Sequence, residues 1–64
     1  MGVLSEAVVS KTDGSASFKA HAWLGGDGMF EAFWYENGQR LNMFFEPSGK
    51  QRGAWKRYEM RLVK

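Results

Sequence analysis

The 64-residue sequence has no cysteine, one proline, one histidine and no apolar run long enough to cross a bilayer. Without cysteine, the chain has neither a disulfide nor a thiolate metal site, and it suits a reducing compartment. Its first residues lack the basic and apolar regions of a secretory signal. We therefore expect a cytoplasmic protein that makes no contact with a membrane.

The single histidine, His21, does not predict a catalytic or metal site. A metal site built on it would need several carboxylates, and no such ligand spacing is present. As a general base, His21 would need a nucleophile and an orienting partner within reach. The chain offers Ser5 or Ser17 for the first role and Glu6 for the second, but a surface pair of Glu6 with His21 is the simpler interpretation. We expect no enzymatic activity, no metal and no cofactor.

Aromatic residues are abundant for a chain of this length. Residues 1–64 are expected to form one small β domain, which buries only about 60% of the surface of its unfolded chain. Ten residues are Phe, Trp or Tyr, and each removes roughly 150–250 Å² from water when it is buried. These rings must therefore supply most of the stabilisation.

The clearest structural pattern lies in residues 29–46. Two apolar runs flank Asn37-Gly38, the strongest short signal for a β-hairpin, because both central residues of that turn need a positive φ. With this turn, Trp34 faces Leu41 and Phe30 faces Phe45 on an apolar side. A shift of one residue would destroy this sorting, so the turn and the apolar pattern predict the same register.

A second hairpin is predicted around Asp13-Gly14, the other favoured pair for a two-residue turn. This turn places Val9 opposite Phe18 and, on the reverse side, Glu6 opposite His21. Residues 25–28, Gly-Gly-Asp-Gly, then separate the two hairpins as a turn. They lack the following helix and the lysine that a phosphate-binding loop requires.

Residues 54–64 fit either a strand or a helix, and the strand is favoured because short loops join the preceding strands. The fold class predicted is all-β: a five-stranded antiparallel meander, curled into a sheet or small barrel, with a helical last segment as the alternative. The expected core consists of Phe18, Leu24, Phe30, Trp34, Leu41, Met43, Phe45, Tyr58, Met60 and Leu62.

Residues 34–58 resemble one unit of the MORN-type repeats, which stack β-hairpins. The resemblance rests on Trp34-Tyr35-Glu36-Asn37-Gly38-Gln39, followed by Gly49-Lys50, Gly53, Trp55 and Tyr58. It implies a binding scaffold and not an enzyme. A repeat array needs three or more units for stability, and the remainder of the chain does not supply them.

The predicted registers leave a second set of side chains on the outer side of the sheet. Tryptophan, tyrosine and arginine dominate protein–protein hot spots, and rings combined with cations also stack and hold unpaired bases. A protein-interaction module, either an adaptor or an inhibitor of a larger protein, is therefore the favoured function, and a single-stranded DNA- or RNA-binding barrel is the alternative. The candidate partner-binding residues are Lys19, His21, Trp23, Phe33, Tyr35, Arg40, Phe44, Trp55, Arg57 and Arg61.

Charge is segregated along the chain. Residues 1–49 carry three basic and six acidic residues, whereas residues 50–64 carry six basic residues and one acidic residue. A basic end of this kind indicates an anionic partner, or it serves to keep an edge strand from pairing with other sheets. The protein is expected to be a monomer or a homodimer that pairs through a sheet edge.

Overall fold

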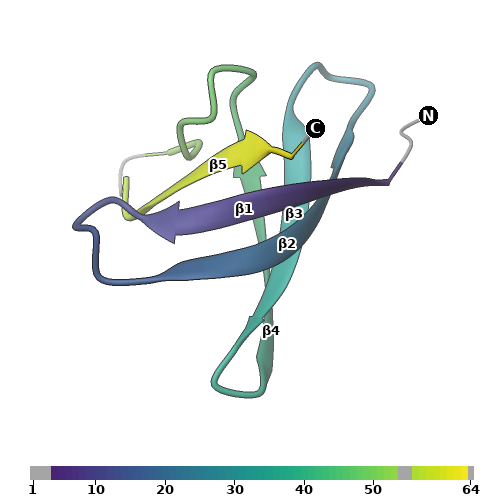
Figure 1. Ribbon diagram of the computed structural model, residues 1–64. Helices are drawn as coiled ribbons and strands as arrows, with labels where there is room; N and C mark the ends of the chain where they lie inside the picture. The colour runs from purple at the N-terminus through teal and green to yellow at the C-terminus, as the bar shows by residue number, and fades with distance from the viewer. Residues whose placement is uncertain (1–3, 54–55, 64) are drawn as a thin grey trace.

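The computed structural model describes residues 4–53 and 56–63, and these residues form five antiparallel strands in one strongly curled, half-barrel sheet (Figure 1). The strands are β1 (Ser5–Lys11), β2 (Ser17–Leu24), β3 (Phe30–Glu36), β4 (Gln39–Phe45) and β5 (Tyr58–Leu62). Their order in the sheet is β4-β3-β2-β1-β5. The predicted all-β class and curled, five-stranded antiparallel sheet are confirmed. β1 to β4 follow one another as a meander, and β5 returns to pair with β1.

The hairpin of β3 and β4 has the predicted turn and register. Asn37 and Gly38 both have positive φ values, 53° and 77°, as a two-residue turn between right-twisted strands requires. Trp34 pairs with Leu41 and Phe30 with Phe45. The local turn chemistry and the apolar pattern therefore determine this hairpin together.

The first hairpin has the predicted pairing but a different turn. Val9 pairs with Phe18 as expected, whereas the loop is longer than two residues because the Lys11 amide donates to the carbonyl of Ala16 (2.9 Å). Only the glycine of the Asp13-Gly14 pair has a positive φ, 81°. Asp13 instead accepts a hydrogen bond from the Ser15 amide (2.9 Å), so the prediction of a two-residue turn was wrong.

The last element is a strand, so the helical alternative was wrong for residues 58–62. β5 pairs with β1 through Val9 opposite Met60 and Val8 opposite Arg61. Residues 54–55 and 64, which the prediction included in this element, lie outside the described residues.

The segment between β4 and β5 closes one end of the half-barrel. Arg52 donates its amide to the carbonyl of Phe44 (3.0 Å), and Met60 donates to the carbonyl of Gly49 (2.9 Å). Short bridges also join Phe45 to Gln51 and Lys50 to Glu59. Residues 44–53 thus connect the two edge strands of the sheet, which lie at opposite ends of the strand order.

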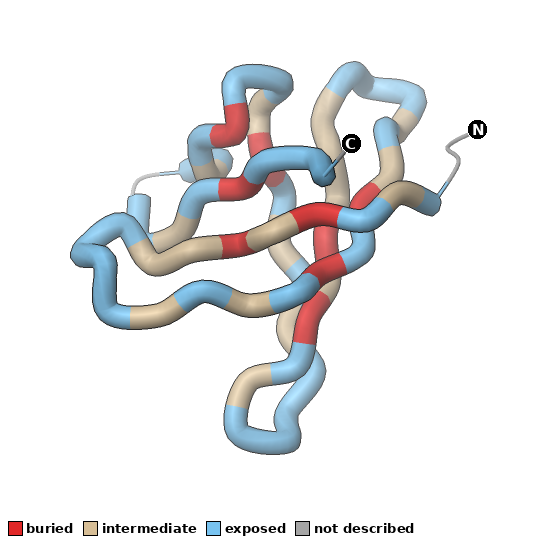
Figure 2. Tube along the Cα trace, in the orientation of Figure 1, coloured by how far each residue is buried: buried red, intermediate tan, exposed pale blue. Residues whose placement is uncertain are grey.

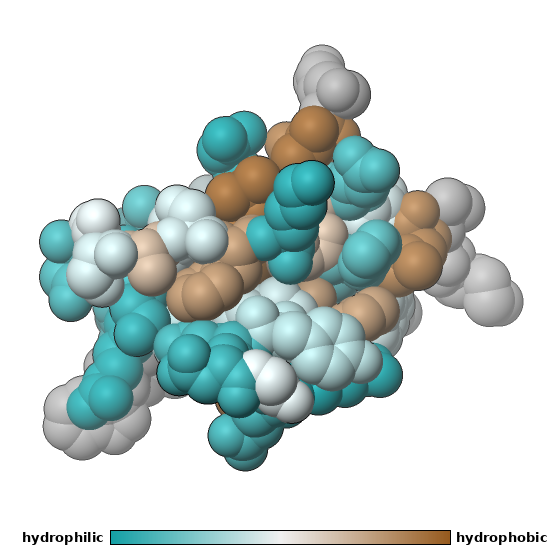
Figure 3. Space-filling view, turned by 60° about the horizontal axis from the view of Figure 1, so that its bottom comes forward, coloured by the Kyte–Doolittle hydropathy of each residue, from teal (hydrophilic) through white to brown (hydrophobic). Residues whose placement is uncertain are grey.

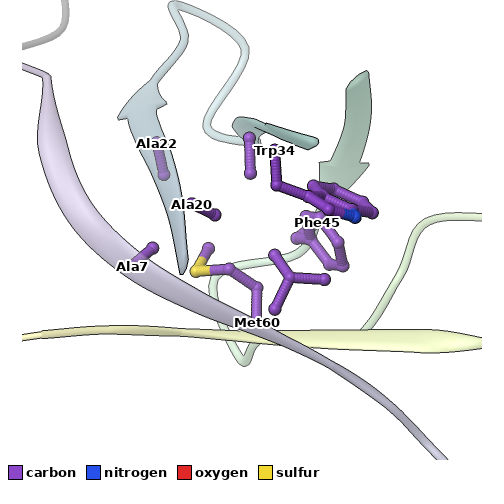
Figure 4. Close-up of a cluster of buried hydrophobic side chains, with 8 residues drawn as sticks. Ala7, Ala20, Ala22, Trp34, Phe45 and Met60 are labelled. Carbon is purple, nitrogen blue, oxygen red and sulfur yellow. The ribbon is translucent and has the colours of Figure 1, made fainter. Parts of the chain in front are cut away.

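The core lies on the inner side of the curl, where buried positions alternate with outward ones along the strands (Figure 2). Trp34 and Phe45 are the largest fully buried side chains, and they face small residues of β1 and β2 (Figure 4). Phe18, Phe30, Leu41, Met43 and Tyr58 are partly buried against this cluster. The full set of buried apolar residues is Ala7, Val9, Ala20, Ala22, Ala32, Trp34, Phe45 and Met60.

Two predicted core residues are exposed, and alanines take the central positions instead. Leu24 and Leu62 retain 47% and 42% of their exposure, because they lie at strand ends where the curled sheet no longer closes over them. At the centre, the strong curvature brings the inner sides of the strands close together. The interior there accepts methyl groups, over which the large rings of β3 and β4 pack.

Candidate functional site

Phe33 lies at the centre of a ring cluster on the outer side of the sheet. The His21 ring stacks on it with centroids 5.4 Å apart, and the Trp23 ring lies tilted at 6.0 Å. The guanidinium of Arg40 lies 4.1 Å from the centre of the Phe33 ring. We call His21, Trp23, Phe33 and Arg40 the outer-face cluster. Three strands position the cluster: β2 carries His21 and Trp23, β3 carries Phe33, and β4 carries Arg40. His21 pairs directly with Phe33 across the ladder.

A chain of polar contacts holds Arg40 in place. Its Nε donates to Oδ1 of Asn42 (3.1 Å), and Nδ2 of Asn42 donates to Oε2 of Glu31 (3.1 Å). Arg40 therefore contacts a ring on one side and a fixed amide on the other. These contacts already restrict the Arg40 side chain, so less of its conformational entropy is lost when a partner binds.

Exposed side chains flank the outer-face cluster. Tyr35 and Phe44 retain 60% and 46% of their exposure, and Lys19 is exposed on β2. A small hollow of about 230 Å³ lies beside His21, between Val8 and Val63. Figure 3 shows one side of the molecule, on which apolar and hydrophilic side chains interleave.

The structure does not bring all ten predicted binding residues together. Seven of them lie on the outer side of β2, β3 and β4: Lys19, His21, Trp23, Phe33, Tyr35, Arg40 and Phe44. Arg61 lies on β5 opposite Val8, so β1 separates it from β2. Arg57 precedes β5, where its carbonyl accepts the Thr12 amide (2.9 Å). Trp55 lies outside the described residues.

Arg61 belongs to a separate, basic cleft of about 360 Å³ along β5. Lys50 and the hydroxyl residues Ser10 and Ser48 also line it, together with Glu59. Within the described residues, the charged groups of Lys50 and Arg61 have no hydrogen bond or ion pair. Two of the six basic residues of the C-terminal segment, Lys50 and Arg61, therefore share a cleft along β5, apart from the outer-face cluster.

Sequence reasoning missed a polar network around Glu36. Its carboxylate accepts hydrogen bonds from Tyr58 Oη (3.1 Å) and Trp34 Nε1 (3.5 Å), and it pairs with Lys11 Nζ (3.2 Å). In the sequence, Glu36 was singled out only as part of the repeat-like motif. Tyr58 and Lys11 lie 22 and 25 residues away in the sequence, so no local pattern indicated the contact. The network ties β3 to β1 and β5 across the open part of the half-barrel.

The pKa values in this network shift in a consistent way. Desolvation raises the pKa of Glu36, but hydrogen bonds from Lys11, Tyr58 and Trp34 outweigh it and leave a lowered pKa. The hydrogen bond to Glu36 raises the pKa of Lys11. Burial, and then the bond to Glu36, raises the pKa of Tyr58. Each group thus keeps its ordinary neutral-pH charge state, as expected of a structural network.

Neither a metal-binding group nor a membrane-spanning helix is found in the described part of the chain. No three His, Cys, Asp or Glu residues there converge as metal ligands. No helix of residues 4–53 or 56–63 has the length and apolar character to cross a bilayer. Comparison of the chain with family models, curated proteins and solved structures found no match, so the resemblance to a repeat unit yields no family assignment.

Proposed function

We propose that the protein is a non-catalytic interaction module that binds a larger protein through the outer side of β2, β3 and β4. The observation that carries the proposal is the outer-face cluster around Phe33, flanked by the exposed rings of Tyr35 and Phe44. Tryptophan, tyrosine and arginine are the residue types that anchor protein interfaces. A sheet positions them rigidly and lowers the entropy cost of binding.

The charge on this surface favours a protein over a nucleic acid. Lys19 and Arg40 are balanced by Glu6 and Glu31 on the outer sides of β1 to β4. A nucleic-acid site needs an excess of cations to replace the counterions of the phosphates. One side of the Phe33 ring is also occupied by Arg40, so a base would have to displace it.

The hollow beside His21 supports a partner side chain as the element that is recognised. Its volume of about 230 Å³ lies below the roughly 300–1,000 Å³ of typical small-molecule pockets. Its apolar rim of Val8 and Val63 and its charged neighbours Lys19 and Glu6 suit a single amphipathic side chain. A catalytic pocket would require more enclosure than this surface provides.

The test compares two double variants in a pull-down from lysate. Tyr35→Ala with Phe44→Ala removes two exposed rings from the outer side of the sheet. Leu24→Ala with Leu62→Ala removes comparable exposed apolar area elsewhere and serves as the matched control. The proposal is supported if one protein is recovered at the same level with the unaltered chain and with the control variant, and is not recovered with the ring variant. Equal recovery by both variants, with circular dichroism unchanged, contradicts it.

The basic cleft favours a second candidate function, the binding of single-stranded DNA or RNA. The charged groups of Lys50 and Arg61 have no hydrogen bond or ion pair within the described residues, and both residues line the same cleft as Ser10 and Ser48. Fluorescence anisotropy of a labelled oligonucleotide should then rise on titration at low salt and fall steeply as salt is added. Lys50→Gln with Arg61→Gln should abolish the signal. Absence of binding near 100 μM protein, about the weak end of non-specific affinity, excludes this function.

A further inference from the structure

β4 forms one edge of the sheet, and only its last residues are covered. The Arg52 amide bonds to the carbonyl of Phe44, and Gln51 bridges to Phe45. From Gln39 to Met43, no other described segment pairs with the outer edge of the strand. Figure 1 shows the β3–β4 hairpin projecting away from the hairpin of β1 and β2.

The register identifies which main-chain groups face this open edge. Glu36 and Gln39 flank a two-residue turn and therefore form a hydrogen-bonded pair. Hydrogen-bonded and non-hydrogen-bonded pairs alternate along an antiparallel ladder. Leu41 therefore directs its main-chain N–H and C=O groups toward β3, whereas Arg40 and Asn42 direct theirs outward. The bond from Arg52 to the carbonyl of Phe44 agrees with this alternation.

The open edge lacks the usual protection against pairing. Edge strands are commonly blunted by lysine, proline or a bulge, and Gln39 to Met43 contain neither lysine nor proline. The ladder of β4 with β3 runs without a bulge. The one cation of the segment, Arg40, lies over Phe33 on the outer side of the sheet. Its charge therefore does not block the approach of another strand to the edge.

We propose that this edge pairs with the same edge of a second copy, antiparallel and centred on Leu41. In this register, Arg40 forms a hydrogen-bonded pair with Asn42 of the partner copy, and Asn42 pairs likewise with the partner's Arg40. Every outward main-chain donor and acceptor of these two residues then has a partner. The two Leu41 side chains meet as a non-hydrogen-bonded pair, which is the closer kind.

The register centred on Asn42 satisfies the edge less well. Centring on Asn42 would place Arg40 opposite Phe44, whose carbonyl already accepts the Arg52 amide. Centring on Leu41 keeps residues 44–53 clear of the contact. The paired copies would form one continuous sheet with both outer-face clusters on the same side. The contact is short, so it is a weak association rather than an interface of the standard size of about 1,600 Å².

Disulfide trapping tests the register. The chain has no native cysteine, so Leu41→Cys introduces a single thiol. The proposed pair places the two Cα atoms about 4.5 Å apart, within the disulfide range of about 4.4–6.8 Å. Met43→Cys is the matched control on the same side of the strand, because its two copies would lie roughly 13 Å apart along the paired strands. Under mild oxidation, Leu41→Cys should cross-link at least about tenfold faster.

Sedimentation velocity tests the use of the edge itself. The unaltered protein should show a rising average mass up to about 1 mM, as mass action requires. Asn42→Pro removes an outward amide that β3 does not use, which edge strands tolerate. Asn42→Ala is its control, because both changes remove the same side chain. The proline variant should stay monomeric while the alanine variant associates.

Three outcomes would overturn the inference. They are a constant monomer mass for the unaltered protein, equal association of the proline and alanine variants with circular dichroism unchanged, and equal cross-linking rates for Leu41→Cys and Met43→Cys. If Asn42→Pro fails to fold, the two cysteine variants still decide the register.

Discussion

The carbonyl oxygen of Met60 occupies the space that a side chain on Gly49 would need. Gly49 is buried with a φ of 97°, and a β-carbon there would overlap that oxygen. Its own carbonyl accepts the Met60 amide (2.9 Å). This close approach allows the segment after β4 to close the half-barrel against β5.

Gly49→Ala should therefore destabilise the protein strongly. The left-handed conformation alone costs about 1–3 kcal/mol for a residue with a side chain, and the overlap with Met60 adds to that cost. Gly14→Ala is the matched control, because Gly14 also has a positive φ, 81°, but open space around it. Urea denaturation should show a larger loss of unfolding free energy for Gly49→Ala. Equal losses would contradict the close approach.

The alanines of the inner face should tolerate no enlargement. Ala32 is fully buried, so Ala32→Leu should cost about 1–3 kcal/mol through overpacking. Leu24→Ala, at a position 47% exposed, should change the unfolding free energy by no more than about 0.5 kcal/mol. Thermal denaturation of both variants checks the contrast. A large loss for Leu24→Ala with none for Ala32→Leu would place the core elsewhere.

The Glu36 network should make stability depend on pH. The folded pKa of Glu36 lies below its ordinary value of 4.5, so its contribution is present above pH 4.5 and is lost as the pH falls through the folded pKa. Glu36→Gln should therefore be less stable than the unaltered protein at pH 7, and the difference should shrink below pH 4.5. Denaturant titrations at several pH values measure it.

The control for this prediction is Glu59→Gln. Glu59 is exposed on β5, and its carboxylate has no hydrogen bond or ion pair within the described residues. A stability difference between the unaltered protein and Glu36→Gln that stays constant from pH 7 to pH 3 would contradict the network.

The contact of Arg40 with Phe33 should contribute modestly to stability. Arg40→Met keeps an unbranched apolar stem and removes the cation 4.1 Å from the ring centre, which should cost about 0.5–1 kcal/mol. Lys19→Met removes a cation from the same side of the sheet, at an exposed position on β2, and should change little. Chemical denaturation at low ionic strength compares the two. Equal effects would show that the contact contributes nothing specific.

The sequence by itself determined the hairpins and the two sides of the sheet. Asn37 and Gly38 set the register of β3 and β4, because a two-residue turn and a period-two apolar pattern are local properties. The same alternation placed Phe33 and Arg40 outside and Trp34 inside. Seven of the ten predicted binding residues therefore lie on one surface of three adjacent strands, while the contacts among them were not predictable.

Only the tertiary structure decided how tightly the sheet curls and what fills it. Alternation sorts side chains by face but does not set curvature, so it could not show that Ala32 is buried while Leu24 is exposed. The Glu36 network and the approach of Gly49 to Met60 join residues far apart in sequence. Such contacts depend on where the curled strands meet, which is a property of the packed sheet as a whole.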